Sequence, residues 1–294
     1  MASLRDLRTR MRAVRQTLQV TAAMNLISTS KLRRGRRMLE DTEPYFTRIQ
    51  KSMFDILSRA EKLDSNFFRI KKPGGSRSAV VVITSDKGLA GAYNANVFRH
   101  AEGLCQRIDS PAIIPVGEIG IRHYEHAQRE TENRFSFHSR LPSMEDAEEV
   151  AGYLISRYLA GTFGEVHVVY THMYSAVKTL PAEKQILPLD TEKIQGELAG
   201  AGNEKRVNLD FEFIPSEGEV FDALIPRYVK GIIYGSMVEA YASEHNARMT
   251  AMSEASKSAE EMLGGLQTAC NRLRQAGITQ EMAEIIGGSA AQRE

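Results

Sequence analysis

The sequence predicts an α/β fold in which the N- and C-terminal segments form a long antiparallel two-helix coiled coil beside a central Rossmann-like α/β domain. Two observations predict it. Apolar residues recur every seven positions at both ends of the 294-residue chain, and short β-rich runs alternate with helical stretches between them. We expect an N-terminal helix over residues 1–63, the α/β domain over 76–214 and a C-terminal helix over 216–288.

The N-terminal helix follows from its repeat. Counting in sevens from Leu4 and from Leu7 gives two series that run to Ala60 and Leu63 and are apolar except between residues 21 and 42. A sustained seven-residue repeat is typical of a left-handed coiled coil. Pro44 interrupts an otherwise helical pattern and should bend or loosen the helix.

The C-terminal helix begins with a capping signal. Ser216 and Glu219 have the spacing of a capping box, and the pair Gly287-Gly288 predicts the end of the helix. Pro226 should kink its first turns.

The same helix carries a second pair of seven-residue series. They start at Leu224 and Tyr228, are mostly apolar, and include glycines that permit close backbone approach. His245 falls on this seam and is expected to be a packed, hydrogen-bonded residue. The two terminal helices are therefore natural antiparallel partners.

Between the helices, the pattern changes to alternating strands and helices, which favours a small sheet that is mostly parallel at its start. The expected helices are 96–107, 119–128 and 145–159, the last capped by Ser143. Residues 191–206 are expected to form an exposed loop. The expected strands are 79–84, 112–116, 135–137, 166–171, 186–189 and 207–214.

Charge is distributed unevenly along the chain. Residues 1–40 hold ten Lys and Arg side chains against Asp6 and Glu40, a net charge of +8 in a chain whose total is +1. Residues 216–288 hold ten acidic and six basic side chains, a net charge of −4. This distribution agrees with pairing of the two helices, and the basic run from Lys31 to Met38 favours an acidic partner.

Several kinds of chemistry find little support in the residues. Gly88 and Gly91 follow a strand but form only GxxG, so a tight turn stabilised by Asp86 and Lys87 is favoured over a phosphate site. The histidines lack metal-ligand spacing, the two cysteines suggest no disulfide framework, and no segment reaches the length of a membrane span. A nucleotide-handling α/β protein and a coiled-coil nucleic-acid binder remain the alternatives.

Three segments resemble one family. RDLRTRMRAVRQTLQVTAAMNLISTSKLRR, VVVITSDKGLAGAYNANVF and NRLRQAGITQEMAEIIGGSAA are similar, in order along the chain, to segments of F-type ATP synthase gamma subunits. The resemblance implies a non-catalytic rotor shaft that transmits rotation between a membrane ion-driven ring and the catalytic alpha and beta subunits. It implies the epsilon subunit and the c-ring as further partners, with no cofactor, no nucleic acid and no direct membrane insertion. The location implied is peripheral, on the cytoplasmic face of a bacterial cell membrane.

The resemblance also implies contacts with the beta subunit. Arg274 and Gln275 match the pair that hydrogen-bonds a beta-subunit loop, and the basic cluster would face acidic loops of beta. The residues that couple catalysis to rotation would be Met24, Arg248, Gln275, Thr279 and Glu281. The basic cluster is Lys31, Arg33, Arg34, Arg36 and Arg37. Ala22 stands where the family usually has lysine, and Ile27-Ser28-Thr29 replaces a smaller run.

Two expectations go beyond the resemblance. The C-terminal helix is longer than its partner, so residues 276–287 should form a single-helix tip that turns in an apolar collar through Ile278, Met282, Ile285 and Ile286. The polar seam should be the torsionally softest part of the shaft, and its residues are Asn25, Ser28, Gly35 and Thr42.

Overall fold

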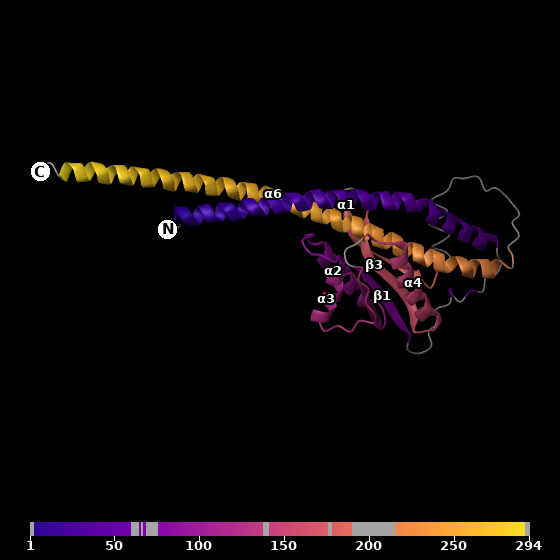
Figure 1. Cartoon of the computed structure of the whole chain (residues 1–294). Helices are drawn as coiled ribbons and strands as arrows, with labels where there is room; N and C mark the ends of the chain where they lie inside the picture. The colour runs from indigo at the N-terminus through magenta and orange to yellow at the C-terminus, as the bar shows by residue number, and fades with distance from the viewer. Residues whose placement is uncertain are drawn as a thin grey trace. The chain divides into compact units, whose positions relative to one another are not determined.

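The computed structural model describes residues 3–59, 65, 67–68, 76–137, 141–175, 178–189, 214 and 216–291. The chain forms two units, one of Met1–Thr29 with Arg248–Glu294 and the other of Ser30–Ala247. Figure 1 shows the elements, which in chain order are α1 (Leu4–Arg59), β1 (Arg77–Ile83), α2 (Tyr93–Cys105), β2 (Pro111–Val116), α3 (Glu118–His126), α4 (Met144–Leu159), β3 (Phe163–Met173), β4 (Thr179–Leu187) and α6 (Glu217–Ala291).

Among the described residues, the sheet has four strands in the order β2-β1-β3-β4. Strand β1 pairs in parallel with β2 and β3, and β4 is antiparallel to β3, so the expected parallel start is confirmed. The segment expected as strand 135–137 is reduced to a single parallel bridge between Val116 and Phe135. Its backbone instead covers the outer side of β2, where Phe135 N donates to the carbonyl of Pro115 at 3.0 Å.

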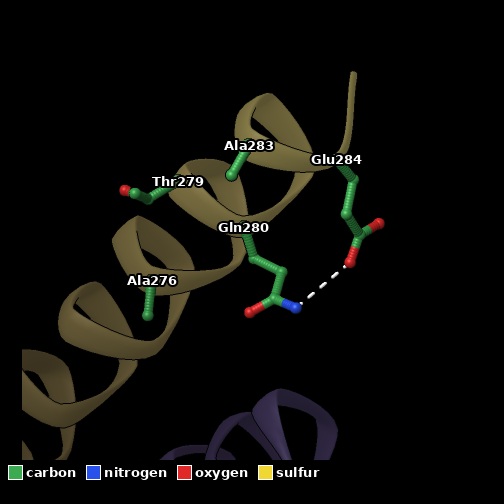
Figure 2. Close-up of a pocket in the computed structure, with 5 residues that line it drawn as sticks. All are labelled: Ala276, Thr279, Gln280, Ala283 and Glu284. Atoms are coloured by element: carbon green, nitrogen blue, oxygen red, sulfur yellow. Dashed lines mark hydrogen bonds between the residues drawn. The ribbon is translucent and has the colours of Figure 1, made fainter. Parts of the chain in front are cut away.

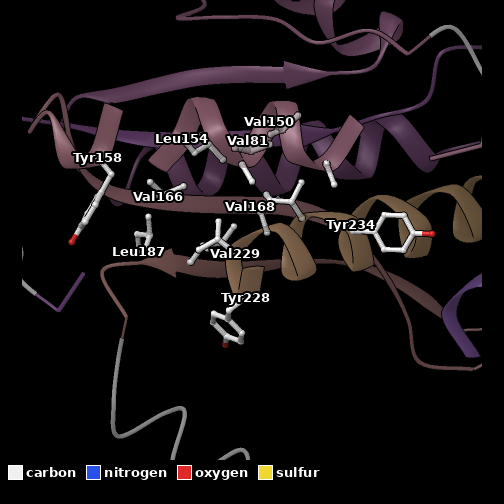
Figure 3. Close-up of a cluster of buried hydrophobic side chains, with 14 of the residues drawn as sticks. Val81, Val150, Leu154, Tyr158, Val166, Val168, Leu187, Tyr228, Val229 and Tyr234 are labelled. Atoms are coloured by element: carbon white, nitrogen blue, oxygen red, sulfur yellow. The ribbon is translucent and has the colours of Figure 1, made fainter. Parts of the chain in front are cut away.

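Two groups of apolar side chains cover the two faces of the sheet. On one face, Val80, Val82 and Val169 pack with residues of α2 and with Tyr124 of α3. On the other, strand residues pack with α4, with the second half of α1 and with the first part of α6. Figure 3 shows Val229 of α6 beside Val166 and Val168 in this second group. The beginning of the C-terminal helix is therefore part of the core of the α/β fold.

The seven-residue pattern is also a burial pattern. Within α1 and α6, every described seam residue predicted from the repeat is buried or half-buried, apart from Gly277. In the first unit, the hydroxyls of Thr21 and Ser256 lie 2.7 Å apart, and Asn25 Nδ2 donates to the carbonyl of Met249 at 3.3 Å. Since residue numbers rise along one helix as they fall along the other, the helices of this unit run antiparallel.

Helix boundaries mostly follow their capping signals. Ser143 accepts a hydrogen bond from Asp146 N, and Asp146 accepts one from Ser143 N, which completes a capping box at α4. Ser216 Oγ accepts from Glu219 N at 3.3 Å at the start of α6. The predicted stop at Gly287-Gly288 is wrong, because α6 continues to Ala291. Glycine permits the left-handed C-cap but does not impose it.

The predicted helices of the α/β domain are confirmed as α2, α3 and α4, with ends that differ from the predicted ones by at most three residues. Both α1 and α6 continue through their prolines, Pro44 and Pro226. His245 is buried, and its ring lies 4.5 Å from that of Tyr241. Several predictions lie outside the described residues, namely seam positions 60 and 63, the loop 191–206, and the strand 207–214 apart from Ile214.

Candidate functional site

Residues 274–286 of α6 are exposed on every side of the helix. Each residue from Arg274 to Ile286 is exposed, so the segment that contains the predicted contacts Gln275, Thr279 and Glu281 is accessible. Ile278, Met282, Ile285 and Ile286 follow helical spacing and are exposed by 51%, 61%, 72% and 69%. Such a stripe on one helix face is typical of a surface that a partner covers.

A neighbouring face of the same segment forms a shallow hollow. Figure 2 shows Gln280 Nε2 donating to Glu284 Oε1 at 3.1 Å, with Ala276, Thr279 and Ala283 beside them. Thr279 Oγ1 donates to the carbonyl of Gln275 at 3.0 Å. One helix supplies all five lining residues, so the hollow is an open protein surface rather than an enclosed ligand cavity.

The predicted basic cluster lies on α1. Arg33, Arg34 and Arg37 are exposed, while Lys31 and Arg36 are half-buried. Arg37 Nε lies 3.8 Å from Asp41 Oδ2, and both side chains are largely solvated, so this pair contributes little stability. The exposed guanidinium groups therefore remain available to a carboxylate-rich surface.

Arg248 differs from the other predicted contacts. Only 5% of it is exposed, whereas Met24 is half-buried and the predicted contacts from Arg274 onward are exposed. Arg248 lies four residues before the buried Met252, on the same helix face. This spacing is a signal in the sequence that could have shown its burial.

The sequence reasoning missed an apolar stripe on the outer face of α1. Val20, Leu26 and Ile27 are exposed by 58%, 73% and 57%. Val20 and Ile27 are seven residues apart and flank Met24 on one face of the helix. The seven-residue repeat from Leu4 and Leu7 predicts only the buried seam. The same seven-residue spacing, started at Val20, leads to Ile27 and indicates the exposed stripe.

The glycine-containing turn after β1 is held together by its own side chains. Asn94 Oδ1 accepts from Ser85 N at 3.1 Å, and Asp86 Oδ1 accepts from Glu118 N at 2.9 Å at the start of α3. Ser85 Oγ donates to the carbonyl of Lys87 at 2.9 Å, which supports the predicted turn. A carboxylate therefore already occupies the N-terminus of α3, where an anionic ligand would otherwise bind.

Glycines next to this turn serve close packing. Gly117 has a φ of +104°, and a β-carbon there would lie 2.4 Å from the carbonyl oxygen of Thr84. Gly120 N donates to Thr84 Oγ1 at 3.0 Å. The contacts account for these glycines through packing, as a structural turn requires.

The titratable groups in the α/β domain show shifts that burial explains. Burial raises the pKa of the Cys105 thiol, which disfavours the nucleophilic thiolate. Burial also raises the pKa of Tyr124. Within the described ranges, no three His, Cys, Asp or Glu side chains are grouped as a metal site would require.

The chain is similar to known proteins over nearly its whole length. A family model described as ATP synthase matches residues 3–292. The ATP synthase gamma chain of Ruminiclostridium cellulolyticum is 36% identical over 291 residues, which cover 98% of each chain.

Solved structures show a similar fold. One is a chain from the Euglena gracilis mitochondrial ATP synthase, in an assembly of OSCP, F1 and c-ring in rotational state 3. It has a TM-score of 0.69 at 17% identity, and the match covers 98% of the present chain and 94% of the Euglena chain. Another is a chain from the central stalk and c-ring of the Tetrahymena thermophila mitochondrial ATP synthase. It has a TM-score of 0.60 at 20% identity, and the match covers 81% of the present chain and 99% of the Tetrahymena chain.

The described helices do not meet the requirements of a membrane span. Within the described ranges, none combines the length and the apolar character that a transmembrane helix needs.

Proposed function

The chain belongs to the ATP synthase gamma-chain family, and from this premise we propose that its two long helices form an antiparallel coiled coil that turns inside the catalytic head. The chain is the central rotor shaft of an F-type ATP synthase and a non-catalytic subunit of that complex. The observation that carries the coiled-coil proposal is the seven-residue burial pattern of α1 and α6.

The partners are the alpha and beta subunits of the head, the epsilon subunit and the membrane c-ring. A rod whose sides differ chemically presents a different surface to each of three identical neighbours. Each neighbour is then biased toward a different conformation, because a contact shifts an equilibrium by its differential affinity for the two states. Rotation of the rod would therefore change the affinity of the catalytic sites in sequence.

The exposed residues of α6 support specific roles in this mechanism. Arg274 and Gln275 would hydrogen-bond a loop of the beta subunit, with Thr279 and Glu281 contributing on the next turns. The stripe that ends at Ile286 would turn in an apolar collar. Its exposure in the isolated chain supports this role, since burial of such a stripe favours assembly.

The N-terminal contacts would be electrostatic and apolar. The basic cluster would face acidic loops of the beta subunit, and charge complementarity of this kind chiefly sets specificity and association rate. Met24 would contribute an apolar contact beside it. Arg248 is also proposed to couple catalysis to rotation, and because it is buried it would act by supporting the shaft surface.

The α/β domain, which we propose to be Rossmann-like and to extend over residues 76–214, would lie toward the membrane ring. The assembled complex is associated peripherally with a membrane, and we place it on the cytoplasmic face of a bacterial cell membrane. Ion flow through the ring would turn the shaft for ATP synthesis, and hydrolysis in the head would turn it in reverse.

Co-purification tests the proposal. Tagged chain, expressed with alpha and beta subunits of a related enzyme, should bring down both and yield a complex in which ATP hydrolysis rotates a probe attached to the α/β domain. Replacing Arg33, Arg34 and Arg37 with glutamate should weaken assembly, whereas replacing the exposed Arg122 and Arg129 of the α/β domain should not. Failure of the wild-type chain to bind both subunits, or saturable nucleotide binding or salt-sensitive DNA binding by the isolated chain, would overturn the assignment.

A further inference from the structure

Two separate segments of the α/β domain make hydrogen bonds to one short stretch of α6, residues 239–243. The first comes from the start of α2. Tyr93 is 6% exposed, and its hydroxyl donates to the carbonyl of Ala240 at 3.1 Å. A helix carbonyl has a second lone pair, so this bond adds to the helix without competing with its ladder.

The other three bonds come from the end of β3. Ser243 is fully buried, and its Oγ donates to the carbonyl of Thr171 at 3.2 Å. Glu239 Oε2 lies 2.5 Å from His172 Nδ1 and accepts from Met173 N at 3.4 Å. The edge of the Tyr174 ring contacts His172, with centroids 4.5 Å apart.

The 239–243 segment is enclosed on all sides. Residues 240–243 are consecutive and all buried, so more than a full helical turn has no exposed face. On the α1 side, a β-carbon at Gly35 would lie 3.2 Å from Ala242 Cβ and from the ring of Tyr241. The α/β domain and α1 thus hold the same turn of α6 from different directions.

We infer that Tyr93, Glu239 and Ser243 are positioning residues that fix the angle of α6 about its own axis relative to the α/β domain, so that torque enters the shaft at residues 239–243. The inference rests on the proposed rotor function. A helix with its side chains has a radius of about 5 Å, so a turn of about 20° moves its surface by about 2 Å. Hydrogen bonds do not survive such a displacement, because their distances vary by only a few tenths of an ångström.

Apolar packing alone would resist this rotation less sharply. Contacts between apolar side chains are non-directional, and a rotated helix can exchange one apolar neighbour for another. The apolar contacts of Ile225, Val229 and Ile233 would keep α6 in the core if the polar contacts were removed. Loss of these four hydrogen bonds is therefore expected to loosen the angle of the helix while leaving the fold in place.

The test uses the assembled membrane complex with a triple variant, Tyr93→Phe, Glu239→Leu and Ser243→Ala, because leucine at 239 has no oxygen to accept the bonds from His172 and Met173. The control is Arg107→Gln with Glu183→Gln, which removes an ion pair of 2.6 Å between the segment that follows α2 and strand β4. This pair does not involve α6. Three quantities are measured: ATP hydrolysis, ions pumped into vesicles per ATP hydrolysed, and the angular variance of a probe on the α/β domain while the head is held fixed.

The triple variant should hydrolyse ATP within about twofold of wild type, because the residues that face the head are unchanged. Its angular variance should rise at least about twofold, since the directional contacts are gone, and its pumping ratio should fall. The control should match wild type in both quantities. Equal variance and pumping in the triple variant and the control would overturn the inference.

If the triple variant does not assemble, the three single variants are measured in the same way, and each should raise the angular variance. Unchanged variance in all three would also overturn the inference. A wild-type complex that neither rotates nor pumps would instead contradict the proposed rotor function, so the two failures are distinguishable.

Discussion

Gly231 of α6 lies where the ring of Phe46 in α1 leaves no room for a side chain. A β-carbon at Gly231 would be 2.3 Å from both Cδ1 and Cε1 of Phe46. The Phe46 ring also lies near that of Tyr234, with centroids 6.2 Å apart, so a shift of the Phe46 ring would disturb a second aromatic contact.

Gly231→Ala should therefore lower the free energy of unfolding by about 1–3 kcal/mol, the usual cost of overpacking a core. Denaturant unfolding of the purified chain measures it. Gly264 provides the matched control, because a β-carbon there meets no atom within 4 Å. Gly264→Ala should raise the free energy of unfolding by about 0.5–1 kcal/mol, and equal effects of the two substitutions would contradict the contact.

Removing the hydroxyl of two buried tyrosines should change the stability of the fold in opposite directions. Tyr124 is 1% exposed, and its hydroxyl finds no hydrogen-bond partner in the part of the chain that is described. Tyr124→Phe removes a desolvated polar group and should stabilise the fold by about 1 kcal/mol, whereas Tyr93→Phe loses the bond to Ala240 and should destabilise it by about 1 kcal/mol. Thermal unfolding distinguishes the two, and shifts of the same sign would count against this assignment.

His123 should make the stability depend on pH. Its ring stacks on Phe98 with centroids 3.7 Å apart, and although much of the side chain is exposed, burial of one face lowers its pKa below the ordinary 6.5, against an opposing effect of Glu102. The unfolded state then binds the proton more readily than the folded state. The contribution of His123 to the free energy of unfolding is therefore fully present above the ordinary pKa of 6.5, and it is lost as pH falls through the lowered pKa of the folded state. Phe98→Ala should raise the pKa measured by NMR titration, and an unchanged value would rule out stacking as its cause.

The exposed stripe at the end of α6 should be required for assembly. Replacing Ile285 and Ile286 with aspartate places charge on a surface that a partner is expected to desolvate, so recovery of the complex with alpha and beta subunits should fall. Replacing both with leucine preserves the apolar character and should leave recovery unchanged. Normal recovery of the aspartate variant would exclude an apolar collar.

The polar seam of Asn25, Ser28, Gly35 and Thr42 should govern the torsional stiffness of the shaft. Burial and packing determine which of these four residues can be replaced with leucine. Leucine has no space at Gly35, where even a β-carbon is tightly contacted, and Ser28 is almost completely buried. Asn25 and Thr42 are half-buried, so Asn25→Leu and Thr42→Leu are the variants to measure. Single-molecule elasticity of the shaft should show stiffening, and unchanged or lower stiffness would contradict the prediction.

Much of the fold could be predicted because it depends on local periodicity. A helix that buries one seam repeats its apolar residues every seven positions whatever it packs against, so positions such as Met11 and Met252 were located from sequence alone. The parallel start of the sheet followed similarly from alternating strands and helices.

Long-range packing could not be predicted in this way. The division into an α/β domain and a separate C-terminal helix did not foresee that Phe221, Ile225 and Val229 belong to the core of the sheet. The contacts of residues 239–243 likewise join segments far apart in sequence, which no local pattern records.

The participation of α6 in the core of the sheet limits how this protein can be recombined with its relatives. A chimera that replaced the whole C-terminal segment would also exchange one wall of the hydrophobic interior, and mismatched side-chain volumes there would be costly. A junction between Ala247 and Arg248, the boundary between the two units in the sequence, would instead exchange only the distal part of α6. The hydrophobic interior of the sheet would then keep its own side chains.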